Sequence, residues 1–491
     1  HRTRVVFLLL LVAAALLLPV WSVRFPPLLD YPNHLASSFV LGHLHDPAYS
    51  FNRLYGAHWG LYPYIATDFL MKILGAVFSM PTAGKLVLSL GVLGIPAAAW
   101  FFLRQANPGE DALAVWGLLA AYNIFFFYGF IGFYCSIALL FFALGLWLRW
   151  LAQPGAWRWT AACLALTATY FAHFMSFAFA ALIMGFYSVT RPKLREWLGT
   201  AALFLPGALC YLLSSRAASR QSGIVFRSAD DKFWSFWNIA HGYSQRLDWI
   251  IVAAVGVLLA AGWIWNSEFR WNGRWVVVSA GMLLTYIALP VGFGDGWDID
   301  IRVLPVLFLL LFAMLRLGRR GWWFAAAALL LFAARTEGIT QHFRRLQPEL
   351  AGMARAFSLT PSNVRVLPIV AGIDEDPIEQ FYPHFWAYGV IDRGWLSPYL
   401  LELPGLLPLH ETGDVYEPDG FWDLSYPAPP DWKEVSNGYD YVWAYDVEKF
   451  RAGLSSIADP VYTSGKLTLY RVRRMADAPM PPPLRPGTPL P

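Results

Sequence analysis

The sequence is dominated by long apolar runs separated by shorter polar segments. Most runs have about 18 to 25 residues, the length that a helix rising roughly 1.5 Å per residue needs to cross about 30 Å of hydrocarbon. A transmembrane β-barrel would instead show short segments of alternating polarity. The pattern therefore predicts an α-helical polytopic membrane protein. Eleven spans are expected, at residues 5–23, 61–80, 84–103, 112–128, 130–149, 158–187, 197–214, 248–265, 274–292, 301–316 and 321–335.

Positive charges in the short connections predict how the spans are oriented. Lysine and arginine are enriched in cytoplasmic loops. If the N-terminus is cytoplasmic, most cationic connections fall on that side: Arg2 with Arg4, Lys85, Arg191 to Arg195, Arg270 with Arg274, and Arg316 to Arg320. The C-terminus is then outside. The first run resembles a signal peptide but lacks a small-x-small cleavage site before Arg24, so it is interpreted as a retained span.

This topology leaves the main polar segments on the outer face. They are residues 24–60, 215–247 and 292–300, together with a long tail. The membrane domain is therefore expected to cover residues 1–335.

The tail has a different pattern from the rest of the chain. Helical periodicity at 338–357 is followed by short runs rich in β-branched and aromatic residues at 364–370, 439–445 and 466–472. This predicts a small extracytoplasmic α/β domain at 336–475. Residues 476–491 are proline-rich and are expected to be disordered.

Composition narrows the possible classes of protein. Of 491 residues, 57% are hydrophobic and only 14% are charged, against roughly 25% charged in soluble domains, which excludes an ordinary soluble fold. The net charge is +4 without a basic stripe, so nucleic acid is not an expected partner. Cys135, Cys163 and Cys210 lie inside apolar runs, which leaves no disulfide framework and no metal-type cysteine spacing.

The densest group of chemically capable residues directly follows the first span, in the sequence DYPNH at residues 30–34. Asp30 would lie at the membrane boundary, where a lipid-linked substrate presents its phosphate and sugar, and could accept a proton from an attacking hydroxyl or amine. His34, one helical turn later, could orient the carboxylate or the phosphate, and Tyr31 is a candidate substrate contact. Alternatively, Asp30 only caps an interfacial helix, because aspartate near proline is a common helix start.

The arrangement of an acidic residue in a D-x-P-x-H setting after one span, many further spans and a C-terminal outer domain resembles the GT-C superfamily of membrane glycosyltransferases. The resemblance implies a polyprenyl-phosphate-linked sugar as donor, Asp30 as the catalytic acidic residue of the first outer loop, and the tail as the periplasmic domain. Relatives with a D-E or E-x-x-R signature in this loop differ, because Tyr31 follows Asp30 here and Ser37 or Ser38 stands where arginine often follows. The resemblance is therefore to the superfamily and not to a subfamily.

A second group lies at the outer end of the tenth span. Asp298 and Asp300 form a D-x-D pair that could hold a divalent cation against a phosphate, and Arg302 could bind the phosphate directly. Alternatively, this is a solvated loop in which Arg302 neutralises an aspartate. Because the topology puts the loop on the same face as Asp30, we expect Asp30 and Arg302 to line one outer cavity.

The loop at 215–247 combines cations with aromatic side chains, a composition that suits an anionic lipid head group. Arg227 and Lys232 are its candidate substrate-binding residues, beside Phe226, Phe233 and Trp234. An interfacial helix that contacts membrane lipid is the alternative.

Asp68, Lys72 and His173 are conspicuous ionisable residues inside expected spans, where such groups usually line polar cavities or pair. Asp68 and Lys72 are four residues apart and can pair with each other. His173 has no local partner and is a candidate for the wall of a substrate cavity, with a hydrogen-bonded structural histidine as the alternative.

Together these features predict an enzyme of the bacterial cytoplasmic (inner) membrane that transfers a sugar from a polyprenyl-phosphate donor to a glycan, lipid or protein acceptor at the outer face. A nucleotide-independent donor agrees with the lack of P-loop and Rossmann glycine motifs. The alternatives are a lipid or polysaccharide transporter or flippase, which would show inverted repeats and midplane charges, and a non-catalytic envelope assembly protein.

The predicted topology can be tested with single cysteines. A cysteine at position 425 should react with an impermeant maleimide added to intact cells, and one at position 188 should react only after permeabilisation. The reverse pattern would contradict the orientation.

Overall fold

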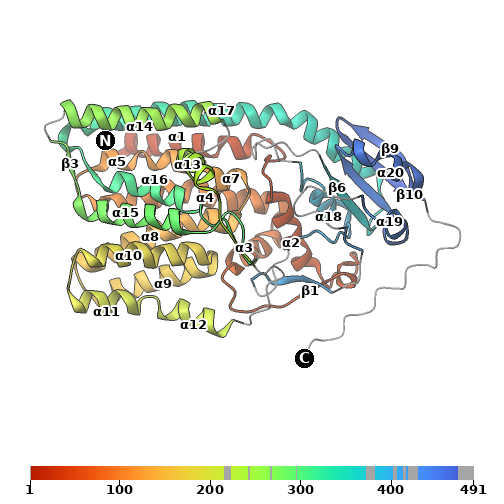
Figure 1. Cartoon of the computed structure of the whole chain (residues 1–491), viewed down its shortest axis with the longest axis horizontal. Helices are drawn as coiled ribbons and strands as arrows, with labels where there is room; N and C mark the ends of the chain where they lie inside the picture. Colours follow the sequence, from red (N-terminus) through yellow and green to blue (C-terminus); the bar gives the residue numbers. More distant parts are fainter. Residues whose placement is uncertain are drawn as a thin grey trace. The chain divides into compact units, whose positions relative to one another are not determined.

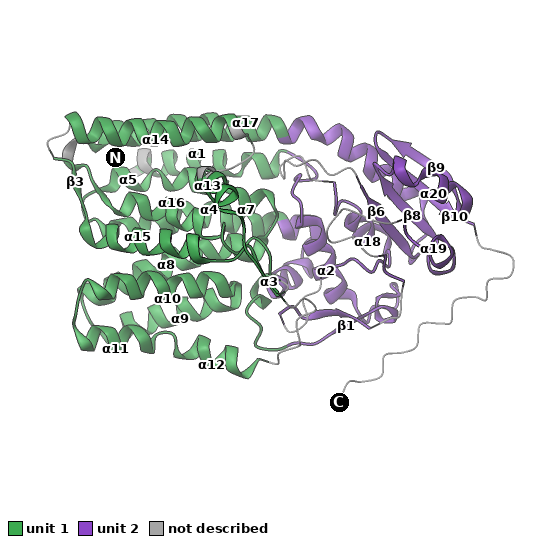
Figure 2. Cartoon of the chain, viewed as in Figure 1, with its two compact units in different colours: residues 1–22, 60–67, 85–342 green, residues 23–59, 68–84, 343–491 purple. Residues whose placement is uncertain are grey.

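The computed structural model describes residues 2–214, 223–240, 244–265, 268–294, 296–371, 382–401, 406–412, 416–418 and 429–473. This part is mostly helical and divides into two compact units (Figures 1 and 2). Unit 1 comprises residues 1–22, 60–67 and 85–342, and unit 2 comprises 23–59, 68–84 and 343–491. The predicted proline-rich end at 476–491 lies outside the described residues.

The division between the units differs from the predicted domain boundary. The expected last span and the expected helix at 338–357 are one continuous helix, α17 (Trp322–Arg355), so position 335/336 is inside a helix. Its first part belongs to unit 1 and its end to unit 2. Unit 2 also contains most of the first polar segment, 23–59, which therefore folds with the tail.

Apolar helices indicate a membrane protein, in agreement with the sequence. Within the described residues, five helical stretches are long and apolar enough to cross a membrane: Met80–Ala106, Ile131–Ala152, Leu194–Leu213, Arg246–Trp265 and Trp322–Leu359. Shorter apolar helices cover Val6–Trp21, Asp111–Phe127, Phe174–Val189, Gly273–Ala288 and Val303–Ala313.

Unit 1 is a helical bundle with two short strand pairs (Figure 1). Its helices are α1 (Arg2–Trp21), α4 (Met80–Ala106), α5 (Asp111–Ala114), α6 (Gly117–Ala120), α7 (Ile124–Phe127), α8 (Ile131–Ala152), α9 (Ala156–Ala172), α10 (Phe174–Val189), α11 (Leu194–Ala202), α12 (Leu205–Leu213), α13 (Ala229–Trp237), α14 (Gln245–Trp265), α15 (Gly273–Ala288), α16 (Val303–Ala313) and the first part of α17, with 3-10 turns at Asn238–Ala240 and Gly318–Gly321. The antiparallel pairs are β2 (Ile224–Val225) with β4 (Gly292–Phe293), and β3 (Arg270–Trp271) with β5 (Leu315–Arg316).

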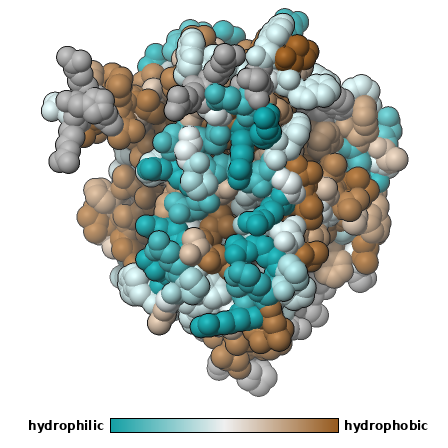
Figure 3. Space-filling model, turned by 90° about the vertical axis from the view of Figure 1, so that its left-hand side faces the viewer, coloured by the Kyte–Doolittle hydropathy of each residue, from teal (hydrophilic) through white to brown (hydrophobic). Residues whose placement is uncertain are grey.

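The surface of unit 1 separates polar from apolar side chains. Figure 3 looks onto the end of the molecule where β3 lies, and shows polar side chains gathered across this end with apolar ones around its edge. Along the helices, large apolar side chains are exposed, among them Leu205, Leu212, Val257 and Leu330. Exposed apolar side chains along helices suit contact with lipid.

The expected sixth span, 158–187, is two helices and not one. α9 and α10 pack against each other and are separated by His173, whose backbone is extended (φ −169°, ψ 127°). The amide of His173 closes α9 on Thr169 O at 2.9 Å, and its Nδ1 accepts from the amide of Met175 at 3.1 Å, which caps α10. Hydropathy misses this break because the flanking residues are all apolar.

Two other expected spans also differ. Residues 61–80 contain only the 11-residue helix α3 (Ile65–Gly75), and this segment is divided between the two units. Residues 112–128 form the three short helices α5, α6 and α7. Interrupted helices leave backbone groups without intrahelical partners.

Arg335 on α17 supplies partners at one of these interruptions. Its guanidinium donates to Tyr122 O (2.8 Å) between α6 and α7, to Ala240 O (2.9 Å), and over a longer distance to Leu119 O. It also lies 3.7 Å from the carboxylate of Asp248 on α14, and both side chains are almost completely buried. One side chain thus connects α17, α14 and the broken helix.

Unit 2 combines the first polar segment with the tail around a mixed sheet. Its four-stranded sheet has the order β6-β8-β10-β9, with β6 (Val366–Val370) parallel to β8 (Tyr441–Tyr445) and the other pairs antiparallel. β6, β8 and β10 (Leu467–Val472) confirm the three predicted strands. The other elements are α2 (Tyr31–His43), β1 (Tyr55–Ala57), α18 (Ala387–Arg393), β7 (Leu409–Glu411), α19 (Trp432–Gly438), α20 (Arg451–Ile457) and β9 (Ala458–Ser464), with 3-10 turns at Phe51–Arg53, Ala356–Leu359 and Glu448–Phe450.

Strand pairing and helix packing both join the first polar segment to the tail within unit 2. β1 pairs antiparallel with β7, and α2 packs against α18. Residues near position 30 are therefore brought beside residues near position 390.

The buried Arg335 predicts a large effect on stability. Arg335→Met should lower the free energy of unfolding by about 3–5 kcal/mol, because Asp248 loses a charged partner and backbone carbonyls lose donors inside an apolar bundle. Thermal unfolding in detergent measures the loss, with Arg104→Met as the control because Arg104 and its partner Asp111 are both about half-exposed.

The control should change stability by less than about 1 kcal/mol. The double variant Arg335→Met with Asp248→Leu removes both charges and should recover part of the loss. Equal stability of the Arg335 and Arg104 variants would contradict the proposed role.

Candidate active site

Asp30 is the N-cap residue of α2, immediately before Tyr31, but its side chain does not cap the helix. Its backbone is already near-helical (φ −88°, ψ −9°), and the carboxylate makes no capping hydrogen bond. Only its backbone carbonyl takes part in the helix, accepting from the amide of His34 at 3.0 Å. The alternative role of Asp30 as a side-chain cap is therefore not the one that the structure shows.

The Asp30 carboxylate instead contacts a histidine from the tail. His384 Nε2 lies 3.2 Å from Asp30 Oδ1, in a turn that leads directly into α18. The Asp30 side chain is 20% exposed and that of His384 is 9% exposed. The pair therefore lies at the edge of the packed unit, with the carboxylate on the more accessible side.

Aromatic packing and one glutamine hold the segment that enters α2. The ring of Phe25 packs edge-on against Phe385 and Tyr388, at centroid distances of 5.3 and 5.0 Å. Gln347 Oε1 accepts from the amides of Arg24 and Phe25, and its Nε2 donates to Phe25 O at 2.9 Å. These contacts join residues 24 and 25 to residues between 347 and 388, and they hold the start of α2 next to His384.

Asn33, one helical turn after Asp30, joins the same group. Its Nδ2 lies 3.3 Å from His384 Nδ1 and donates to Tyr399 O at 2.9 Å, and its Oδ1 accepts from the amide of Leu401 at 2.6 Å. Asn33 is 1% exposed. We refer to Asp30, Asn33, His34 and His384 as the α2 cluster.

His34 is half-buried in the α2 cluster and is a neutral imidazole at physiological pH. Burial lowers its pKa to about 4, an effect that Asp30 opposes and His384 reinforces. His34 is thus unsuited to bind a phosphate as a cation at neutral pH, and its expected orienting role would be that of a neutral imidazole.

The structure gives no support to a substrate contact for Tyr31. Its side chain is fully buried, and its hydroxyl lies against Gly84, where an added Cβ would be only 2.5 Å away. Burial raises the pKa of Tyr31 well above its usual value. Tyr31 belongs to the packing of unit 2.

A second group of predicted residues meets in unit 1. Arg302, at the N-terminus of α16, places Nη1 2.9 Å from His173 Nε2 and donates from Nη2 to Trp297 O at 3.0 Å. The guanidinium also lies 5.0–5.8 Å from three phenylalanine rings, those of Phe125, Phe130 and Phe133. Two candidate substrate residues 129 positions apart are thereby neighbours.

The helix break at His173 accounts for part of this arrangement. The imidazole receives the Met175 amide on one nitrogen and faces Arg302 with the other. A neutral imidazole carries one proton, so it accepts at only one of these nitrogens at a time. The residue is 3% exposed and serves the backbone as well as Arg302.

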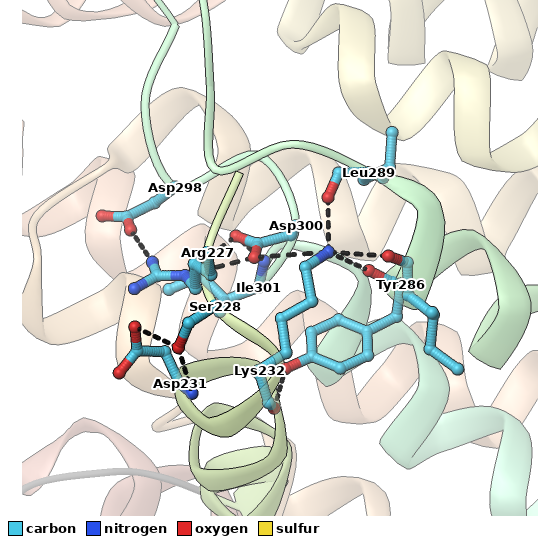
Figure 4. Close-up of polar contacts among 10 residues, drawn as sticks. Arg227, Ser228, Asp231, Lys232, Tyr286, Leu289, Asp298, Asp300 and Ile301 are labelled. Carbon is cyan, nitrogen blue, oxygen red and sulfur yellow. Dashed lines mark hydrogen bonds and ion pairs between the residues drawn. The ribbon is translucent and has the colours of Figure 1, made fainter. Parts of the chain in front are cut away.

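Asp298 and Asp300 both pair with the side chain of Arg227 (Figure 4). Arg227 Nη2 lies 2.6 Å from Asp298 Oδ1, and Arg227 Nε lies 3.1 Å from Asp300 Oδ2. Burial raises the pKa of Asp298, against the opposing effect of Arg227. No set of three possible metal ligands occurs in the described part of the chain. The two aspartates form an ion-pair cluster with Arg227, and Arg302 also favours the ionised form of Asp298. The expected cation site at Asp298 and Asp300 stays a prediction.

Lys232 completes this cluster and caps a helix. Its Nζ lies 3.9 Å from Asp300 Oδ2 and donates to the carbonyls of Tyr286, Ile287 and Leu289 at the C-terminal end of α15 (Figure 4). A cation there is also favoured by the helix dipole. Arg227 and Lys232 are therefore engaged within unit 1, which does not support their predicted binding of a lipid head group.

The remaining predictions have separate outcomes. Asp68 accepts from Ser38 Oγ at 3.3 Å, and Lys72 lies over the ring of Trp59 at 4.9 Å, so the expected Asp68–Lys72 pair is replaced by other partners. Asp30 belongs to unit 2 and Arg302 to unit 1. Their shared cavity stays a prediction.

Sequence reasoning missed His384 and Asn33. Asn33 lies inside the DYPNH segment but carries no charge, and His384 is a lone histidine in an aromatic, proline-rich segment. The only available signal was that a histidine stood in the tail close to the predicted strands.

Comparison of the chain with protein-family models and with curated proteins found no match.

The lowered pKa of His34 predicts a pH-dependent stability. An unfolded histidine titrates near 6.5, and His34 titrates near 4 in the folded state. Between these values the unfolded chain binds the extra proton, so this contribution to stability is complete above about pH 6.5 and is lost as the pH falls toward 4.

The variant His34→Gln should lose this contribution. The unfolding temperature should therefore decrease less steeply between pH 7 and pH 4 for His34→Gln than for the wild type. His45→Gln, at an exposed position, is the control and should follow the wild type. Parallel curves for all three proteins would contradict the assignment.

Proposed function

We propose that the chain is an integral-membrane glycosyltransferase of the GT-C type. It transfers a sugar from a polyprenyl-phosphate donor to a glycan, lipid or protein acceptor at the outer face of a bacterial cytoplasmic membrane. The observation that carries this proposal is the state of the Asp30 carboxylate. It follows the first apolar helix, leaves the cap of α2 unused, and is held by His384 with part of its surface open.

In the proposed reaction, Asp30 accepts the proton of an acceptor hydroxyl as the acceptor oxygen attacks the anomeric carbon of the donor. The bond from that carbon to the phosphate oxygen breaks, and polyprenyl phosphate leaves with the electron pair. General-base assistance of this kind contributes typically 10²- to 10⁴-fold in rate.

For the donor phosphate the proposal retains Arg302. An arginine stays charged under all physiological conditions and offers a planar set of donors to phosphate oxygens. Aromatic rings around the guanidinium support this role, because they exclude water and so strengthen its interaction with an anion.

We also propose eleven spans, with the N-terminus inside and the tail outside. The set differs from the one expected from hydropathy in two places. Residues 61–80 no longer count as a span, and residues 158–187 count as two, α9 and α10. The two changes cancel, so the proposed sides of both termini are unchanged.

The transfer reaction is tested with purified protein in liposomes, a panel of radiolabelled polyprenyl-phosphate sugars, and envelope extract as the source of acceptor. Asp30→Asn should reduce the transfer rate by at least about 100-fold, because the amide does not accept the proton. The unfolding temperature should stay unchanged, because the amide has the size of the carboxylate. Asp459→Asn is the matched control, since its carboxylate is exposed and pairs only with Arg473 in the described part of unit 2.

The control should transfer sugar at the wild-type rate. Near-normal turnover by Asp30→Asn would remove the general-base role. Failure of the wild type with every donor would remove the transfer reaction itself.

A further inference from the structure

The orientation of the Asn33 amide is fixed by two backbone groups. The amide of Leu401 donates to Oδ1 at 2.6 Å, and Nδ2 donates to Tyr399 O at 2.9 Å. A flipped amide would set its oxygen against the Tyr399 carbonyl and its NH₂ group against the Leu401 amide. Both contacts would then be repulsive, so Nδ2 must face His384.

This orientation determines which nitrogen of His384 carries the proton. Asn33 Nδ2 has a second hydrogen, and the atom in reach is His384 Nδ1 at 3.3 Å. Nδ1 therefore accepts, and in a neutral imidazole the proton is then on Nε2. Nε2 lies 3.2 Å from Asp30 Oδ1, so its N–H points at the carboxylate.

We infer that His384 is a positioning residue for Asp30: a neutral imidazole, locked as a donor by Asn33, that holds the carboxylate and leaves it as the proton acceptor. This inference rests on the proposed function. It adds to that function a residue supplied by the tail, more than 350 positions from Asp30 in sequence.

The same geometry argues against His384 as the base. In an aspartate–histidine pair that activates a nucleophile, the carboxylate binds one N–H and the other nitrogen is open to receive the proton. Here the second nitrogen is occupied by Asn33. His384 contacts Oδ1 of Asp30. Among the described residues, the other carboxylate oxygen, Oδ2, is left to receive the acceptor's proton.

Two substitutions separate the functions of the two imidazole nitrogens. In His384→Gln the side-chain amide can reach Asp30 and donate to it. In His384→Asn the shorter side chain keeps an oxygen for Asn33 but loses the donor to Asp30. We expect His384→Asn to lower kcat about 10- to 100-fold, the loss typical of a hydrogen bond to a charged group, with the donor KM unchanged. His384→Gln should stay within a few-fold of the wild type.

The tautomer is measured directly by ¹⁵N NMR of histidine-labelled protein at pH 7. The His384 signals are identified by their disappearance in His384→Gln, and His45→Gln serves as the control for both measurements. The expected result is a protonated Nε2 and an unprotonated Nδ1. A proton on Nδ1, or on both nitrogens, would overturn the inference, as would a His384→Gln variant as impaired as His384→Asn.

The NMR result is independent of turnover. If the wild type transfers no sugar, the proposed function fails, and the tautomer still decides whether Asn33 locks His384 as the donor. If sugar is transferred but Nδ1 carries the proton, the inference fails alone. Should His384→Asn not fold, the wild-type spectrum and the activity of His384→Gln remain decisive.

Discussion

Backbone groups that leave a regular helix inside an apolar bundle need partners, because hydrocarbon offers none. Unit 1 meets this constraint with a small number of polar side chains. Arg335 donates to a carbonyl at the break between α6 and α7, and Lys232 donates to carbonyls at the end of α15. His173 accepts from a backbone amide at the break between α9 and α10. Arg335 and Lys232 also lie close to the carboxylates of Asp248 and Asp300, so these two side chains provide backbone partners and charge pairing together.

This constraint explains why ionisable residues in such a sequence are easily taken for ligand contacts. Arg227 and Lys232 are residue types that often bind anionic ligands, but here they pair with the carboxylates of Asp298 and Asp300. The α2 cluster is different. Within the described residues, the side chain that contacts the Asp30 carboxylate is a histidine and not a lysine or arginine. A carboxylate that is hydrogen-bonded without being neutralised by a permanent cation retains its ability to accept a proton.

Hydropathy predicted the helical membrane class because it measures how much apolar surface a segment carries. It does not measure chain direction, so the reversal at His173 was invisible and residues 61–80 were assigned too great a length. The three tail strands were predicted correctly because β6, β8 and β10 alternate or are uniformly apolar over five or six residues. At the candidate site, the local motif was enough to single out Asp30 as a candidate. Its partner His384 was not, because a contact between residues so far apart in sequence leaves no local pattern.

The pairing of β1 with β7 has a consequence for the order in which the molecule is made. Residues 55–57 leave the ribosome long before residues 409–411, so the first polar segment must wait for nearly the whole chain before its strand finds a partner. Contacts of such high sequence separation form late in folding. During synthesis the α2 segment is thus present without His384, and the complete set of side chains around Asp30 exists only in a finished chain. A prematurely terminated product would carry the carboxylate without the tail that orients it.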